Sequence, residues 1–363
     1  MLVPGLFIYL PSIGGAEYIG LIISLFTVTA MISRPLSGKL ADRIGRKPVI
    51  MAGALVCFIC SLLYPVLTTV FGFLFLRLLH GFSTGFTPTG EAAYISDIIP
   101  PDRRGEAMGL MGTSSSLGMA SGLSFGGWFI STYSMESLFY CSSAFAILSA
   151  LIVITIKETV KEKHAITYRL LLVSKVDLFE PRVIMPCVVM GLCAYAYGTL
   201  FTIATDYSTF FAIENKGLLF TYFTIASLMI RLLAGRASDT YGRVRVLKFS
   251  TMIMTIAMGI IAFASTKMML IIGVFMYGLG QGANSPTLLA WAADLSLPEH
   301  RGRGLASLYI LMEFGIGIGA FFSGLIYVNN PLQFYIPFGV GGILSFIAFL
   351  YLWTRPSRVS AFK

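Results

Sequence analysis

Charged residues are scarce in this chain of 363 residues: they make up 12% of it, whereas a soluble globular domain carries about 25%. Hydrophobic residues make up 56%, and they gather in apolar runs that recur along the whole chain. These runs are about 20 residues long, enough to cross a hydrocarbon layer as a helix. The sequence therefore predicts an all-α membrane protein that crosses the bilayer many times.

Cysteine is also sparse, and its placement argues against a metal or redox site. All five cysteines lie inside apolar runs, and the Cys57–Cys60 pair has no second pair of ligands. The glycine-rich runs 278–282 and 315–319 lie inside apolar helices with no strand before them, so we interpret them as close helix packing. Phosphate-binding loops and paired catalytic carboxylates are missing. We therefore expect no enzyme, no ATP-driven pump, no cofactor and no metal.

The net charge of +9 indicates how the chain is oriented in the membrane rather than a nucleic-acid partner. Of the 26 lysines and arginines, all but Lys216, Lys267 and Arg77 fall on loops or helix ends that share one side if the helices alternate. Such asymmetry is the positive-inside signature. We therefore expect no nucleic acid, a lipid bilayer as partner, and a multi-pass protein of the inner (plasma) membrane.

An internal repeat sets the architecture. The stretch Gly38-Lys-Leu-Ala-Asp42-Arg43-Ile-Gly45-Arg46-Lys47 lies between two apolar runs, and its charges predict a tight loop at the membrane surface. A similar stretch, with fewer charged residues, occurs 197 residues later: Gly235-Arg-Ala-Ser-Asp239-Thr-Tyr-Gly242-Arg243-Val. The same offset holds across about 100 residues, for Arg34 and Arg231, Asp97 and Asp294, and Gly105 and Gly302. Two six-helix halves of one orientation follow, with a substrate site between them near the midplane.

The repeat divides the chain into four parts. We expect an N-terminal bundle at 1–156, a cytoplasmic linker at 157–180 with a surface piece at 166–173, a C-terminal bundle at 181–354 and a cytoplasmic tail at 355–363. The expected helices are 1–10, 17–36, 48–66, 70–97, 106–130, 137–156, 181–206, 216–235, 245–265, 267–295, 304–327 and 332–354, with a turn at 11–15. Because helix 7 begins near Pro181, the repeat predicts that the first half of helix 1 is missing, through a start codon assigned too late or a truncated product.

Two motifs resemble those of a known family. The stretch 38–47 looks like the loop 2–3 signature of the major facilitator superfamily, and Arg77-Leu-Leu-His80-Gly81-Phe-Ser-Thr-Gly85 resembles its helix 4 motif. The resemblance covers essentially the whole chain and is strongest to bacterial exporters of drugs and small metabolites. Gly118-Met-Ala-Ser-Gly122 keeps the glycines of the drug–proton antiporter signature, but Met119 stands where that signature has proline.

The resemblance implies a conformational latch. A carboxylate can sit at the positive N-terminal end of a neighbouring helix, and for Asp42 that helix is implied to begin near 302–304. Arg43 or Arg46 can pair with Asp97; in the second half, Asp239 would face the helix near Gly105, and Arg243 would pair with Asp294. These contacts would bridge the halves only when the cytoplasmic side is closed. The alternative is topogenic charge alone. The expected latch set is Gly38, Asp42, Arg43, Gly45, Arg46, Asp97, Asp239, Gly242, Arg243 and Asp294.

Ionisable residues inside membrane helices are the second group of candidates, because one at the midplane costs roughly 2.5–3.5 kcal/mol. Glu313 has the neutral repeat partner Ser116, and we interpret it as a proton-titrating or cation-binding carboxylate, or else as one bonded to a neighbouring helix. Arg77 would tune proton coupling or attract an anion, or else cap carbonyls on helix 1. His80 more often marks a helix contact, and the role of Glu91 stays open between latch and cavity.

Polar and aromatic residues complete the candidate cavity. Gln281 and Asn284 on helix 10 and Tyr195 on helix 7 suit a cavity for an amphipathic solute, although each alone is typical of packing. The predicted function is alternating access driven by protons, with efflux of a small amphipathic compound or drug by a monomer. Uptake of a sugar or other metabolite by proton symport is the alternative, and a transport-inactive receptor or partner protein is the alternative from another class.

Overall fold

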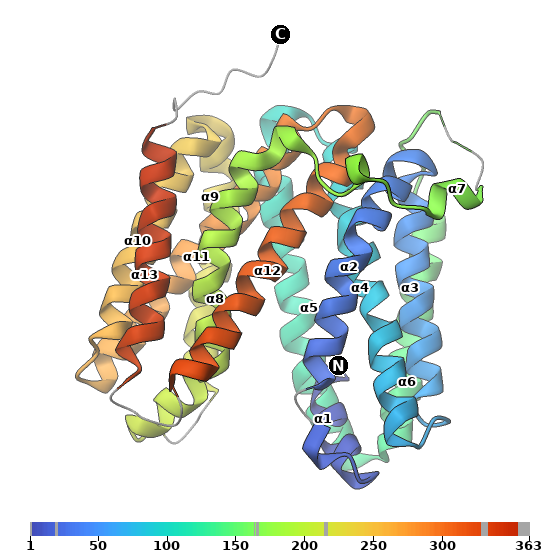
Figure 1. Ribbon diagram of the computed structural model, residues 1–363, viewed down its shortest axis with the longest axis horizontal. Helices are drawn as coiled ribbons and strands as arrows, with labels where there is room; N and C mark the ends of the chain where they lie inside the picture. The colour runs from blue at the N-terminus through green and yellow to red at the C-terminus, as the bar shows by residue number, and fades with distance from the viewer. Residues whose placement is uncertain are drawn as a thin grey trace. The chain divides into compact units, whose positions relative to one another are not determined.

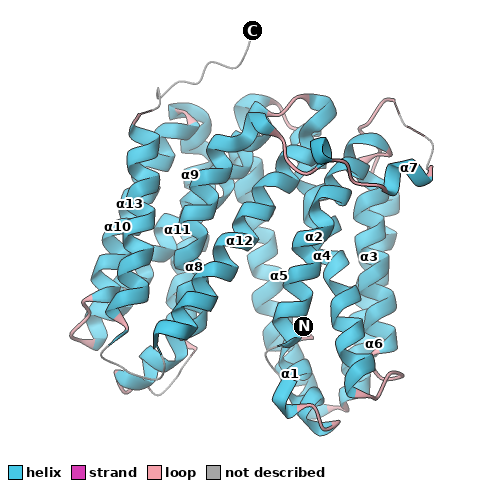
Figure 2. Ribbon diagram, viewed as in Figure 1, coloured by secondary structure: helices cyan, strands magenta, loops and turns pink. Residues whose placement is uncertain are grey.

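The computed structural model describes residues 2–18, 21–162, 164, 167–213, 217–327 and 333–354. Helices make up nearly all of these ranges, and no strand occurs in them (Figure 2). The expectation of an all-α protein is confirmed. The helices are α1 (Val3–Ser12), α2 (Leu21–Arg43), α3 (Arg46–Leu63), α4 (Val70–Ile98), α5 (Arg104–Thr132), α6 (Met135–Thr155), α7 (Tyr168–Leu171), α8 (Ile184–Phe210), α9 (Leu218–Tyr241), α10 (Arg243–Ala262), α11 (Lys267–Leu295), α12 (Arg301–Tyr327) and α13 (Tyr335–Trp353).

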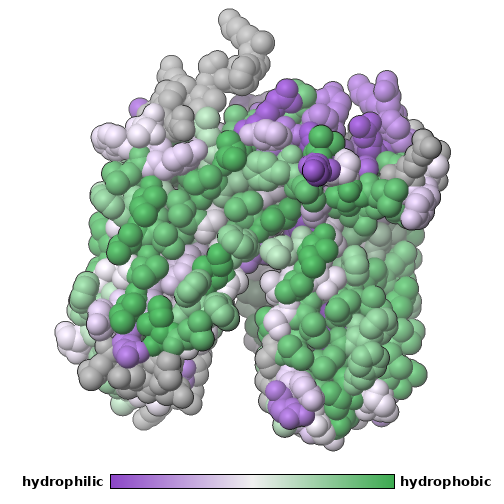
Figure 3. All heavy atoms as spheres, viewed as in Figure 1, coloured by the Kyte–Doolittle hydropathy of each residue, from purple (hydrophilic) through white to green (hydrophobic). Residues whose placement is uncertain are grey.

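Within the described ranges, nine helical stretches are long and apolar enough to cross a membrane. Two further helices, α5 and α11, have 29 residues each but fall outside this set. In α11, polar residues such as Gln281 and Asn284 interrupt the apolar run. Figure 3 shows apolar residues over the sides of the helices and polar residues gathered at helix ends. Large apolar side chains such as Ile32, Phe71 and Phe249 are exposed, as expected for surfaces that lipid covers.

The chain forms two compact units, and each contains pieces from both sides of the linker. Unit 1 comprises Met1–Ile98, Ser114–Glu180 and Leu297–Tyr309; unit 2 comprises Ile99–Thr113, Pro181–Ser296 and Ile310–Lys363. Two helices are therefore divided. The first ten residues of α5 belong to unit 2, and the first nine of α12 belong to unit 1.

The same packing pattern recurs in each unit (Figure 1). In unit 1, α4 packs on α2 and α3, and α6 packs on α3 and α1. In unit 2, α11 packs on α9 and α10, and α13 packs on α10 and α8. The core of unit 1 gathers where α1, α3, α4 and α6 meet, around the fully buried Tyr64, Phe73 and Phe139. In unit 2, Tyr207 stacks on Phe334 and Phe338.

The structure corrects two boundaries. The stretch 38–47 was predicted to be a loop, but α2 continues to Arg43 and α3 begins at Arg46, so only Ile44 and Gly45 lie outside a helix. The charges do not end the helix because their partners lie beside it, as described below. The turn expected at 11–15 begins later, since Pro11 lies inside α1, and Gly14 takes a positive φ of 89°. The surface piece expected at 166–173 is the single turn α7, while Ile166 and the tail 355–363 lie outside the described residues.

Candidate functional site

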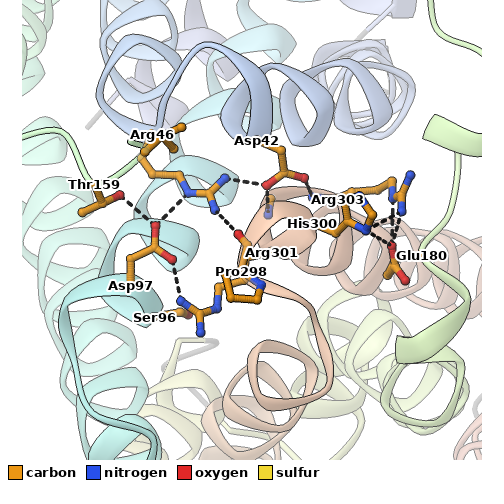
Figure 4. Close-up of polar contacts among 12 residues, drawn as sticks. Asp42, Arg46, Ser96, Asp97, Thr159, Glu180, Pro298, His300, Arg301 and Arg303 are labelled. Atoms are coloured by element: carbon orange, nitrogen blue, oxygen red, sulfur yellow. Dashed lines mark hydrogen bonds and ion pairs between the residues drawn. The ribbon is translucent and has the colours of Figure 1, made fainter. Parts of the chain in front are cut away.

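The carboxylate of Asp42, near the end of α2, caps the beginning of α12. Its two oxygens accept hydrogen bonds from the backbone N–H groups of Gly302 (2.7 Å) and Arg303 (2.9 Å) (Figure 4). These donors have no partner inside the helix, and the helix dipole favours an anion there. The approach is close because Gly38 lacks a side chain: a Cβ at that position would lie 2.7 Å from the Cβ of Ala306.

Arg46 joins this cap to the end of α4. Its Nη1 lies 2.5 Å from Asp42 Oδ1, its Nε lies 3.0 Å from Asp97 Oδ2, and its Nη2 donates to the carbonyl of Pro298 (3.1 Å). Arg301, the first residue of α12, binds the other oxygen of Asp97 at 2.7 Å. The Arg46 side chain is 1% exposed, so water does not screen these pairs as it does at a surface. Both repeats thus contribute charges to one buried network.

Unit 2 contains the same network with the repeats exchanged. Asp239, near the end of α9, accepts hydrogen bonds from the N–H groups of Gly105 (2.8 Å) and Glu106 (2.9 Å) at the beginning of α5. Arg243 binds Asp239 Oδ1 at 2.5 Å and Asp294 Oδ2 at 3.0 Å. Arg104 binds the other oxygen of Asp294 at 2.9 Å. Every one of these contacts has its counterpart in unit 1 at the offset of 197 residues.

Two glycines make the sharp connections that both networks need. Gly45 joins α2 to α3 with φ 123° and ψ 160°, and Gly242 joins α9 to α10 with φ 93° and ψ 145°. This backbone region is open almost only to glycine. Because each glycine precedes the arginine of its network, the turn it makes places that arginine beside both aspartates.

The structure separates Arg43 from the network and adds two arginines that the sequence reasoning missed. Arg43 is exposed, and its Nη1 lies 3.4 Å from His164 Nε2 rather than on Asp97. Arg301 and Arg104 take that place. They are one position before the paired glycines Gly302 and Gly105, so the repeat already contained the signal.

Arg77 is buried against α2. Its Nε donates to the carbonyl of Ile22 (2.9 Å), its Nη1 lies 3.5 Å from the hydroxyl of Tyr64, and its guanidinium lies 4.5 Å from the centre of the Phe26 ring. The capped carbonyl is on α2, not on helix 1 as the alternative predicted. His80 Nδ1 lies 3.3 Å from the same Tyr64 hydroxyl, so α3 and α4 meet here. These contacts suit a structural role.

Two carboxylates lie away from the networks. Glu313 stands at the middle of α12, in unit 2, and is 7% exposed. Glu91 lies in unit 1, two turns before the end of α4, is half-buried, and has no ion-pair partner among the described residues. Neither belongs to the arginine–aspartate networks, so the structure assigns Glu91 no contact in the latch.

The polar residues of α11 line up on one face of that helix. Asn284 is 1% exposed, and its Oδ1 accepts a hydrogen bond from Ser250 (3.3 Å), but its Nδ2 has no partner among the described residues. The same holds for Gln281 Oε1 and for the hydroxyl of Tyr277. Tyr195, on α8, is 4% exposed. Buried polar atoms normally have partners, so this face of α11 retains unused hydrogen-bonding capacity.

Comparisons with known proteins fit this geometry. The family model of the Major Facilitator Superfamily matches residues 1–215 and 211–363. A multi-drug resistance efflux pump of Streptococcus pneumoniae is 27% identical over 88% of this chain and 83% of its own length. The fold is similar to that of the human organic anion transporter MFSD10, with a TM-score of 0.78 and 19% identity over 96% of this chain and 88% of that chain. It is also similar to that of the proton:xylose symporter XylE, with a TM-score of 0.81 and 14% identity over 97% of this chain and 91% of that chain.

The chain belongs to the major facilitator superfamily. It is therefore a transmembrane transporter of small molecules and not an enzyme, as the sequence predicted.

Proposed function

We propose that the protein exports a small amphipathic compound by alternating access, in exchange for protons, as a monomer in the plasma membrane with its linker and C-terminus cytoplasmic. The reciprocal charge network is the observation that carries this proposal. It ties the beginning of each repeat's fifth helix to the fourth helix of the other repeat through the ion pairs Arg301–Asp97 and Arg104–Asp294. Backbone hydrogen bonds to Asp42 and Asp239 tie it to the second helix. Efflux is favoured over uptake because curated relatives include multidrug efflux pumps.

The network supports a latch because its parts can break together. Breaking one partner out of a buried pair leaves an uncompensated charge, which costs roughly 3–5 kcal/mol. When the beginning of α12 leaves Asp42, however, the aspartate, both arginines and Asp97 all become accessible to water at once. The free energies of the closed and open states then differ by much less than the summed cost of breaking each ion pair alone. A carrier that moves between two states requires such a small difference.

Glu313 is the candidate for proton coupling, and α11 is the candidate for substrate contact. Glu313 is a buried carboxylate in a membrane helix whose repeat partner, Ser116, is neutral, so the repeat architecture alone does not account for it. Gln281 and Asn284 offer an acceptor and a donor that the protein leaves unused. Together with the buried ring of Tyr277, they suit a solute that is apolar with one or two polar groups.

The test uses everted membrane vesicles that contain the 363-residue chain. The vesicles are energised, the acidity of the lumen is followed with a quenched dye, and amphipathic cations, neutral drugs and sugars are added in turn. We expect proton release with one class of amphipathic compound and none with Glu313→Gln. The matched control, Glu299→Gln, removes an exposed carboxylate from the turn before α12 and should release protons like the unchanged chain.

The outcomes separate the alternatives. Acidification of right-side-out vesicles upon addition of a sugar would instead indicate proton symport and uptake. If the folded protein produces no proton movement with any compound in either orientation, proton-coupled transport is wrong, and a receptor or partner protein becomes the better interpretation.

A further inference from the structure

The two networks differ at one pair of equivalent positions. In unit 2, Arg236 of α9 forms a direct ion pair with Glu106 of α5, with Nη2 and Nε at 2.8 and 3.0 Å from Oε1. The equivalent positions in unit 1, at the offset of 197 residues, are Lys39 of α2 and Arg303 of α12. Both are cations, so they repel each other where unit 2 has an attraction.

The linker supplies the missing anions. Lys39 Nζ lies 2.9 Å from Asp177 Oδ2 and donates to the carbonyl of Leu172 (2.8 Å). Arg303 Nε lies 2.9 Å from Glu180 Oε2, and its Nη1 donates to the carbonyl of Val176 (3.0 Å). Each cation thus has one carboxylate and one backbone carbonyl, all from residues 172–180. Figure 4 shows Glu180 turned towards Arg303 and His300.

This segment is held in place at both carboxylates, and the contact at Glu180 is buried. The backbone N–H of Glu180 donates to the hydroxyl of Ser307 on α12 (2.9 Å), and the Glu180 residue is 2% exposed. Asp177 closes a short turn by accepting from the N–H (2.9 Å) and hydroxyl (2.6 Å) of Ser174. A carboxylate at such depth is retained only when it is paired, so Glu180 and Arg303 depend on each other.

We propose that residues 172–180 form a strap that is a working part of the latch, in which Asp177 and Glu180 are positioning residues that bridge α2 to α12. The strap does in unit 1 what the Arg236–Glu106 pair does directly in unit 2. The linker is then more than a tether between repeats: the beginning of α12 cannot leave α2 without releasing the strap. The role of the strap in the latch rests on the proposed function. Its bridging of α2 to α12 does not, and can be tested without measuring transport.

Hydrogen–deuterium exchange of the full chain in lipid nanodiscs tests the bridge. The double variant Asp177→Asn, Glu180→Gln should speed exchange in peptides covering 172–183 and 301–309 by more than about tenfold, because the two cations lose their counter-charges. Glu162→Gln, which removes an exposed linker carboxylate, should change neither. Peptides covering 104–113 and 236–243 report on unit 2 and should keep their exchange rates, which shows that the variant is folded.

A charge substitution makes the test specific. Arg303→Glu places in unit 1 the pattern of unit 2, so Lys39 can pair with α12 directly. We expect fast exchange in the strap, slow exchange at the beginning of α12, and retained transport. Arg303→Ala should lose protection in both segments. The proposal is overturned if the double variant exchanges like Glu162→Gln, or if Arg303→Glu and Arg303→Ala expose α12 equally. Every variant could show the expected exchange pattern and yet lose transport. That result would count against the proposed function and not against the strap.

Discussion

Arg104 and Arg301 lie 197 positions apart, and each binds an aspartate at the end of the other repeat's fourth helix: Arg104 binds Asp294 at 2.9 Å, and Arg301 binds Asp97 at 2.7 Å. The relationship is reciprocal, as in an interface between two identical subunits. Two separate networks result, one in each unit, and each can be perturbed alone.

The separation of the networks gives the first prediction. Asp42→Asn removes the charge that caps α12 and should speed hydrogen exchange at residues 301–303 but not at 104–106; Asp239→Asn should do the reverse. The cap contributes up to about 2 kcal/mol when partly buried, so rates should rise by up to roughly thirtyfold. Equal acceleration in both segments from either single variant would show that the networks are not independent.

The turn glycines give the second prediction. Gly45→Ala and Gly242→Ala force a side chain into a backbone region that costs of order 1–3 kcal/mol, so each should lower the thermal midpoint in detergent. The control is Gly259→Ala, inside α10, where a Cβ meets nothing within 4 Å. That variant should be neutral or gain about 0.5–1 kcal/mol, because alanine favours the helix. A midpoint unchanged by Gly45→Ala would contradict the assigned backbone.

Glu313 gives the third prediction. If it carries the coupling proton, Glu313→Gln should abolish transport driven by a pH gradient but retain exchange of labelled for unlabelled substrate across the membrane, since that exchange moves no net proton. Both rates are measured in the same proteoliposomes. Loss of both activities in a protein that still binds substrate would favour the structural alternative for Glu313.

Arg77 gives the fourth prediction. Because its guanidinium donates to the carbonyl of Ile22 and lies over the Phe26 ring, Arg77→Ala should destabilise the protein by about 1–3 kcal/mol, through the loss of a buried hydrogen bond from a charged group and of the packing on the ring. Lys267→Ala, which changes an exposed cation at the beginning of α11, should leave the thermal midpoint unchanged. A stable Arg77→Ala protein with an altered proton-to-substrate ratio would instead support the coupling role.

The sequence predicted the helices well because long apolar runs and a constant repeat offset leave few alternatives. It was wrong about the stretch 38–47, where charges were taken to mark a loop. Asp42 and Arg46 remain on helices because both have polar partners beside them: Arg46 pairs with Asp42 and Asp97, and Asp42 also caps the beginning of α12. The pairing was predicted, but not that it lets the helices continue through the charged stretch. Arg104 and Arg301 were not predicted, although each directly precedes one of the paired glycines Gly105 and Gly302.

The strap could not be predicted at all. The linker has no counterpart in the repeat, so no offset relates Asp177 or Glu180 to a partner. Their pairing depends on the path that the chain takes over α2 and α12. The buried polar face of α11, by contrast, follows from helical spacing, although the spacing could not show which atoms of Gln281 and Asn284 lack a partner.

The division of α5 and α12 between the units has a consequence for how this gene can change. Each network draws residues from both repeats, as domain-swapped subunits exchange arms, so neither repeat has a complete set of its own. A substitution at one of these positions in one repeat therefore affects a partner in the other repeat. The sequences of the two halves can therefore diverge on their lipid-facing sides. At the network positions, a change in one half requires a matching change in the other.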